Sequence, residues 1–188
     1  MDKSLLHKSK QSDMTRFSAL ATTRRSIRQY TDEPLSPGEV EQIMRSALLS
    51  PSSKNSRSWE FVLIEDKILL KQLSLCKSSG AAFLENCALA IVVLTDPLQS
   101  EAYIEDSAIA ATYIQLQAED LGLGACWIQI RGRETSGGSD SEQYVRDLLG
   151  IPFQLFVGCI IAVGHKATEG KPHSDDQLQW EKLHIGKY

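Results

Sequence analysis

The sequence predicts a protein of mixed helix and strand, of the α/β or α+β class. Apolar residues recur at helical spacing in some segments, short apolar runs of strand length lie between them, and clusters of Gly, Pro and Ser separate the two kinds. The 188 residues are the size of one domain, and 42% of them are hydrophobic, which is enough to form a sizeable core. We therefore expect one domain in which helices alternate with about four or five strands.

Helices are expected in five segments, namely 13–23, 36–49, 67–75, 103–121 and 139–149. Two of them begin with a capping box, in which Ser36 pairs with Glu39 and Ser139 pairs with Glu142. The middle of 103–121 is apolar on nearly all sides, which is typical of a helix in a large core or in an interface.

Strands are expected at 59–65, 88–94, 125–131, 156–163 and 178–185. The run 156–163 is continuously apolar, as in a strand that is buried on both faces. The segment 178–185 alternates between apolar and polar residues and is expected to be a last, edge-like strand. The segment 24–31, which precedes the first capping box, is expected to be extended.

Charge and hydropathy argue against two classes of partner. The net charge is −4, from 20 basic and 24 acidic residues, so a dedicated nucleic-acid binder is not expected. The longest apolar run, 155–164, has ten residues, whereas a membrane-spanning helix needs about 20. Residues 1–14 lack a signal-peptide pattern and are expected to form a polar arm before a domain of residues 15–188. The four cysteines are widely spaced, so buried thiols and a reducing, cytoplasmic setting are expected: Cys76, Cys87, Cys126 and Cys159.

No motif for a metal site, a nucleophilic serine or a phosphate-binding loop occurs in the sequence. The sequence also presents no side-chain machinery for general acid–base catalysis. This pattern fits an enzyme whose cofactor carries the chemistry, and it fits a binding module equally well.

Arg24, Ser26 and Arg28 are spaced two residues apart in the segment that is expected to be extended. Side chains at this spacing point to the same side, which would place two guanidiniums and a hydroxyl on one surface. A guanidinium can bind a phosphate through two hydrogen bonds. Arg25 and Ile27 would face the other way, with Ile27 toward the core. The alternative is a solvated basic turn that pairs with nearby acidic residues.

The loop Pro51-Ser52-Ser53-Lys54-Asn55-Ser56 carries three hydroxyls and an amide. These groups offer donors and acceptors that suit a flat heterocycle with imide-type edges. The alternative is an ordinary connection rich in turn-forming residues. Further along, Lys171 and His173 could complete a cationic phosphate pocket, or they could form an exposed basic loop.

In this order the segments resemble the nitroreductase family of FMN-dependent NAD(P)H oxidoreductases. The resemblance rests on 24–30 and 50–59, and it is supported by 106–111, 121–127, 163–165 and 171–173. It covers about residues 15–188. It implies an α+β fold with a central, mainly antiparallel mixed sheet flanked by helices. It also implies an intertwined homodimer, with FMN at the interface and 178–185 reaching across to the partner's sheet.

The resemblance further implies which residues bind FMN. Arg24 and Lys171 would hold the 5′-phosphate, and Ser26 would bind phosphate or ribityl oxygens. Arg28 would lie near the pyrimidine edge, where a positive charge stabilises the reduced flavin. The other residues of the implied set are Arg25 and His173, the backbone amides of Ile128 and Gln129 near the flavin N5, and Pro51, Ser52, Ser53 and Asn55 from the other subunit.

The implied reaction moves a hydride from NAD(P)H through flavin N5 to a small organic acceptor of the nitroaromatic, quinone or enone type, with ping-pong kinetics. No side chain is then needed as a nucleophile or acid. Two alternatives stay open: a module that binds or stores flavin without turnover, and another FMN reaction on the same fold, such as dehalogenation or heterocycle oxidation.

The sequence departs from the family pattern near the proposed ligands. Arg57-Ser58 stands where Gln-Pro is common, so a rigid turn is lost and a charge is added near the expected cleft. His173 stands where arginine is frequent, and a histidine that is mostly neutral at pH 7 predicts weaker phosphate binding as the pH rises. Arg131 and Arg133 either contact the substrate or the phosphate of the nicotinamide nucleotide, or form a solvated surface.

Overall fold

The computed structural model describes residues 15–188, so the expected polar arm lies outside the described residues. In the described part of the chain, four strands form one sheet in the order β1-β2-β4-β3, and each neighbouring pair is antiparallel. Their bounds are β1 (Trp59–Ile64), β2 (Leu89–Thr95), β3 (Leu123–Gln129) and β4 (Phe156–His165). The expected parallel element is a single bridge between Ser26 and Ala125, at the edge of the sheet.

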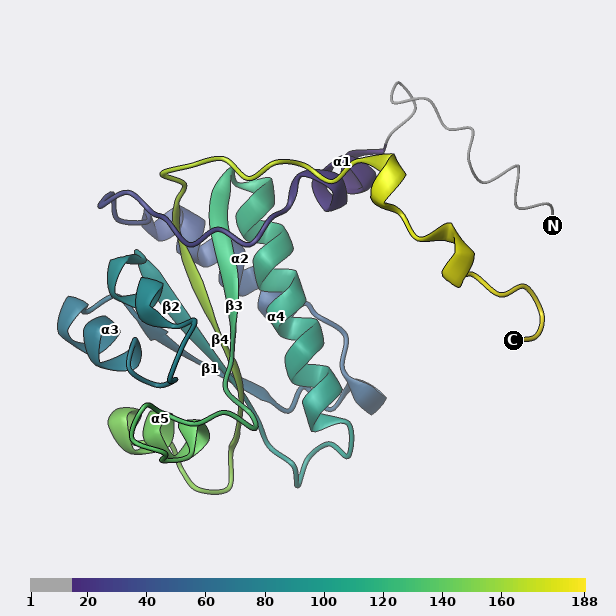
Figure 1. Ribbon diagram of the computed structural model, residues 1–188. Coiled ribbons are helices and arrows are strands. Elements are labelled where there is room, and N and C mark those ends of the chain that lie inside the picture. The colour runs from purple at the N-terminus through teal and green to yellow at the C-terminus, as the bar shows by residue number, and fades with distance from the viewer. Residues whose placement is uncertain (1–14) are drawn as a thin grey trace.

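Helices cover both faces of this sheet (Figure 1). On one face α2 (Pro37–Leu48) and α4 (Tyr103–Asp120) pack against the strands, and on the other face lie α3 (Lys67–Leu73) and α5 (Ser141–Leu149). A short α1 (Arg16–Thr23) lies at the outer edge, and 3₁₀ turns complete the elements: η3 (Ser53–Asn55), η4 (Ala82–Asn86), η5 (Asp175–Gln177) and η6 (Trp180–Lys182). The α+β class is therefore confirmed, and no helix within residues 15–188 is long and apolar enough to cross a membrane.

The central strands explain why the sheet forms the core. Every residue of β2 is buried, and β4 is buried from Val157 to Gly164. These are the continuous apolar runs of the sequence, and each pairs on both sides with another strand. The four cysteines are also buried and unpaired, as expected from their apolar surroundings.

One of the two predicted capping boxes is confirmed and the other is wrong by one residue. The Ser36 hydroxyl accepts from the Glu39 amide at 3.3 Å, and the Glu39 carboxylate accepts from the Ser36 amide at 2.7 Å. At α5 the cap is Asp140, whose carboxylate accepts from the Gln143 amide at 2.8 Å. Ser139 cannot take this role because its backbone closes a turn with the preceding loop.

The prediction of a strand at 178–185 is wrong. This tail contains the turn η6, and it runs past α1 and away from the sheet (Figure 1). The amide of His173 donates to the Thr22 carbonyl at 3.0 Å, which fixes the point where the tail leaves α1. Alternating polarity favours a strand only where a neighbouring strand supplies hydrogen bonds, and the tail has no such neighbour among the described residues.

The segment 24–31 is extended, as predicted, and lies against the N-terminal end of β3. The Ile27 amide donates to the Ala125 carbonyl at 3.0 Å, and the Ile27 side chain is buried. A Cβ atom on Gly124 would lie 2.7 Å from Cγ2 of Ile27, so only glycine permits this close approach. The sheet edge therefore fixes the position of the basic residues on both sides of Ile27.

Candidate functional site

Arg24, Ser26 and Arg28, called the basic cluster here, alternate with Arg25 and the buried Ile27 along the extended segment, and Ser26 bridges to Ala125 of β3. Burial raises the pKa of the Cys126 thiol, and Arg28, a hydrogen bond from Ser26 and Arg24 each partly offset that rise. Ser26 and Arg28 are exposed and Arg24 is partly exposed, so this cluster presents two cations and a hydroxyl to a ligand from outside.

Lys77 is a further cation that sequence reasoning missed, and its charge also lowers the pKa of Cys126. The guanidinium of Arg28 lies over the ring of Phe83, 5.9 Å from the centroid, which holds the Arg28 head group in place. The signal for Lys77 was its position in a loop of small residues, 76–80, directly after a predicted helix.

Arg25 contacts His173 in the C-terminal tail. Its Nη1 lies 3.1 Å from Nδ1 of His173. A Cβ atom on Gly170 would lie 2.5 Å from Cβ of Arg25, so this glycine allows the two segments to touch. The structure thus brings the segment of Lys171 and His173 to the basic segment, although Lys171 itself is exposed.

The second predicted segment, the loop 51–56, continues to the start of β1, and residues 51–58 together are called the serine loop. Its backbone turns through the left-handed region at three residues that are not glycine: Lys54 (φ +52°), Asn55 (φ +55°) and Arg57 (φ +52°). Such residues cost roughly 1 kcal/mol or more each and persist only where other contacts hold them. One of these contacts is the Ser52 hydroxyl, which accepts from the Arg57 amide at 2.8 Å.

The main anchor of the serine loop is Asp106, which is buried in the first turn of α4. Its carboxylate accepts from the Ser53 amide at 2.8 Å and from the Ser100 hydroxyl at 2.6 Å. The hydroxyls of Ser56 and Ser58 also donate to it, each at 3.4 Å. Sequence analysis placed Asp106 only in a helix motif, since a single aspartate carries no signal of these distant partners.

The two halves of the predicted site lie at opposite ends of α4 in one chain (Figure 1). The serine loop is bound to Asp106 near the N-terminal end, whereas the helix before segment 24–31 is tied through Arg16 to Asp120 at the C-terminal end, at 2.9 Å. Asp106 and Asp120 are 14 residues apart, which corresponds to about 21 Å along the helix axis. One chain therefore does not bring the serine loop to the basic cluster.

Ile128 and Gln129 are the last two residues of β3, which is an edge strand of the sheet. The Gln129 amide group is held on both sides: its Oε1 accepts from Nε1 of Trp127 at 3.1 Å, and its Nε2 donates to the Arg131 carbonyl at 3.1 Å. Because β3 pairs with β4 on one side only, part of its backbone faces outward. This edge can offer amide donors to a bound ligand.

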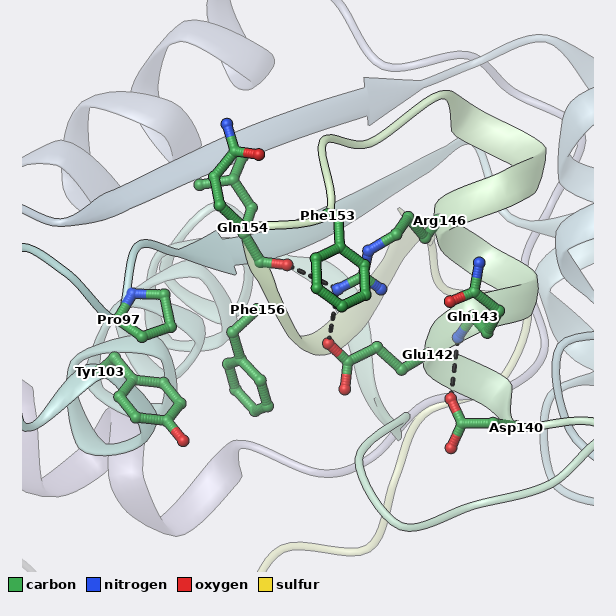
Figure 2. A pocket seen from close by; sticks show the side chains of 10 residues that line it. Pro97, Tyr103, Asp140, Glu142, Gln143, Arg146, Phe153, Gln154 and Phe156 are labelled. Carbon is green, nitrogen blue, oxygen red and sulfur yellow. Dashed lines mark hydrogen bonds and ion pairs between the residues drawn. The ribbon is translucent and has the colours of Figure 1, made fainter.

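A cleft of about 330 Å³ lies elsewhere, between α5, the start of α4 and the start of β4 (Figure 2). Its buried Arg146 donates to the Glu142 carboxylate at 2.9 Å and to the Leu155 carbonyl at 2.7 Å, beneath the exposed ring of Phe153. These contacts engage Nη2 of Arg146, whereas its Nε is buried without a hydrogen-bond partner among the described residues. No residue of the predicted FMN set lines the cleft.

The structure is thus an α+β protein, with an antiparallel sheet that helices cover on both faces and a basic cluster at the sheet edge. Comparison with known protein families gives the same class. The family model described as the nitroreductase family matches residues 21–82 and 72–165. These matches span well over half of the described residues, and the chain belongs to the nitroreductase family.

Particular relatives agree with this assignment. An FMN-dependent nitroreductase from Clostridium difficile R20291 has a solved structure that matches with a TM-score of 0.88 and 42% identity, over 90% of this chain and 98% of that one. A protein of Archaeoglobus fulgidus with the provisional name NADH dehydrogenase/NAD(P)H nitroreductase is 33% identical over 171 residues, 88% of this chain and 95% of that protein. An FMN reductase (NAD(P)H) of Bacillus subtilis is 26% identical over 89% of this chain and 77% of its own length.

Proposed function

We propose that this protein is an FMN-dependent NAD(P)H oxidoreductase that reduces a small organic acceptor. The observation that carries the proposal is the basic cluster of Arg24, Ser26 and Arg28, which lies on the extended segment beside β3 at an edge of the nitroreductase fold. Guanidiniums and a hydroxyl on one surface are the groups that bind phosphate and anionic ring edges. The relatives named above as an FMN-dependent nitroreductase and an FMN reductase support FMN as the ligand.

The donor set of the cluster fits FMN. Arg24 and Lys171 would hold the phosphate, and Ser26 would bind phosphate or ribityl oxygens. Arg28, fixed over Phe83, would supply positive charge at the pyrimidine edge. When bound, FMN would accept a hydride from NAD(P)H at N5 and pass it to the acceptor, so the protein needs to bind, orient and stabilise charge rather than transfer protons from its side chains.

The proposed site is composite and requires a homodimer. Within one chain the serine loop and the basic cluster lie at opposite ends of α4, so the serine loop of a second copy would complete each site. Large apolar side chains are exposed on α1, on the end of α2 and on the tail, as expected of surfaces that a partner covers: Phe17, Leu48, Leu49, Leu178, Leu183 and Ile185. Ser52, Ser53, Asn55 and Pro51 would then approach the flavin from the partner.

The acceptor is proposed to be a nitroaromatic, a quinone or an enone, with ping-pong kinetics. Arg57, which is exposed in the serine loop, would place a charge at the mouth of the composite site. This charge favours acceptors with electron-rich oxygens, such as nitro or carbonyl groups.

The first test is the colour of the purified protein and its reduction without oxygen. The protein is expected to bind FMN and turn yellow, and anaerobic NADH or NADPH is expected to bleach it within the time of a turnover. A protein that takes up no FMN would contradict the proposal. A yellow protein that neither nucleotide bleaches would instead be the storage module.

A double substitution, Arg24→Ala with Lys171→Ala, tests the placement of the phosphate. Loss of two charged hydrogen-bonding partners is expected to weaken FMN binding about 100-fold or more. Fluorescence titration with FMN measures this change, and Lys71→Ala, at an exposed position of α3, is the charge control. Equal FMN affinity in the double variant and in the wild type would show that the phosphate lies elsewhere.

A further inference from the structure

Four hydrogen-bond donors converge on the carboxylate of Asp106. The two shorter bonds come from the backbone amide of Ser53, at 2.8 Å, and from the hydroxyl of Ser100, at 2.6 Å. The hydroxyls of Ser56 and Ser58 complete the set. Asp106 is 1% exposed, so these contacts rather than water satisfy its oxygens.

Three of these donors belong to the serine loop, whose backbone needs such an anchor. The backbone of Lys54, Asn55 and Arg57 is in the left-handed region, which residues other than glycine rarely adopt. The loop also holds its own side chains, because the guanidinium of Arg57 donates to Oδ1 of Asn55 at 3.2 Å. Asp106 therefore fixes the backbone from inside, and Arg57 orients a proposed flavin-contacting amide from outside.

Ser58 gives this anchor a role particular to this chain. It stands where the family resemblance led us to expect proline, and it is 2% exposed. Its hydroxyl donates to Asp106, which a proline could not do. The rigidity that a proline would give to the turn is thus supplied here by a hydrogen bond to a buried carboxylate.

We propose that Asp106 is a positioning residue that holds the serine loop in the shape required to bind FMN across the dimer. This inference rests on the proposed function, because Ser52, Ser53 and Asn55 are the proposed contacts from the second subunit. Asp106 lies under the loop and does not touch the flavin itself. Its removal weakens FMN binding by releasing strained backbone, and not by removing a ligand.

The test compares Asp106→Ala and Asp106→Asn with the wild type in the full-length protein. Asp106→Ala is expected to weaken FMN binding about tenfold or more, because three loop donors lose their acceptor. Asp106→Asn is expected to recover most of the affinity, since the amide oxygen still accepts from the Ser53 amide and the hydroxyls can accept from its nitrogen. Glu105→Ala is the matched control, an exposed carboxylate in the same turn of α4.

A second readout needs no bound flavin. Limited digestion with trypsin is expected to cut after Lys54 and Arg57 faster in Asp106→Ala than in the wild type or Glu105→Ala, as mass spectrometry of the fragments would show. FMN is expected to slow this cutting in the wild type. If FMN affinity and cutting rates in Asp106→Ala equal those of the wild type, the inference is overturned.

Ser58→Ala keeps the inference testable if Asp106→Ala does not fold. It removes one donor from the loop and leaves Asp106 in place, so about threefold weaker FMN binding and faster cutting after Arg57 are expected. No change in either would overturn the inference. If the wild type binds no FMN, the proposed function fails, whereas the digestion results still report whether Asp106 holds the loop.

Discussion

The missing side chain of Gly124 sets how closely the basic segment approaches the sheet. A Cβ atom there would meet Cγ2 and Cβ of Ile27 at 2.7 and 2.8 Å. Gly124→Ala is expected to lower the free energy of unfolding by about 1–3 kcal/mol, as for overpacked core sites, and to weaken FMN binding by shifting Ser26 and Arg28. Urea unfolding and FMN titration measure the two effects.

Gly38→Ala is the control for this substitution. Gly38 lies in the first turn of α2 with no atom within 4 Å of an added Cβ, so alanine is expected to be neutral or stabilising by up to about 1 kcal/mol. A Gly124→Ala protein as stable as Gly38→Ala would show that the segment 24–31 adjusts freely.

The buried thiols predict a loss of stability at high pH. Burial raises the pKa of Cys76 and of Cys87 to about 12, from an ordinary value of 9.0. Because their pKa is raised in the folded state, the neutral buried thiols contribute fully to the free energy of unfolding below about pH 9. This contribution is lost as the pH rises toward 12. The urea midpoint is expected to fall as the pH rises above about 9, and Cys87→Ala is expected to show a smaller fall. An equal fall in both proteins would assign the effect to other groups.

At the scale of elements, helix caps separate the right prediction from the wrong one. Ser36→Ala and Asp140→Ala are each expected to destabilise the protein by about 1 kcal/mol, because each leaves a helix amide without its acceptor. Ser139→Ala is expected to change the free energy of unfolding by less than about 0.5 kcal/mol. Thermal unfolding of the three variants measures these losses of stability. Equal losses in Ser139→Ala and Asp140→Ala would show that Ser139 also caps α5.

The cap of α2 also depends on pH. Hydrogen bonds from the Ser36 hydroxyl and amide lower the pKa of Glu39 below its ordinary value of 4.5. The stabilisation from these bonds is present above pH 4.5 and disappears as the pH falls through the lowered pKa. The difference in stability between wild type and Ser36→Ala is therefore expected to shrink in acid, which unfolding at pH 7 and below pH 4 would measure.

At the scale of the whole molecule, the tail leaves the sheet with three apolar residues exposed, Leu178, Leu183 and Ile185. Deletion of 174–188 is expected to weaken the proposed homodimer by about tenfold or more, since burying such side chains stabilises an interface by about 1.5 kcal/mol or more each. Analytical ultracentrifugation over a dilution series measures the dissociation constant. Deletion of 186–188 alone is the control, and a dimer of unchanged strength after the longer deletion would assign the interface to the helices.

Much of the fold could be predicted because each part had a local cause. The apolar runs became β2 and β4, and the Ser36 box began α2 where expected. The tail could not be predicted, because polarity alternates in the same way whether or not a strand lies alongside. Lys77 and Asp106 were missed for a related reason: their partners lie far away in the sequence.

The sequence by itself determined the class of fold, the extended form of segment 24–31, and the family. Periodicity and order are properties of short stretches, so they can be read without coordinates. Only the tertiary structure decided that the basic cluster and the serine loop lie at opposite ends of α4, and that Asp106 anchors that loop. Such relations depend on how distant segments pack, and no local pattern of residues encodes a distance between them.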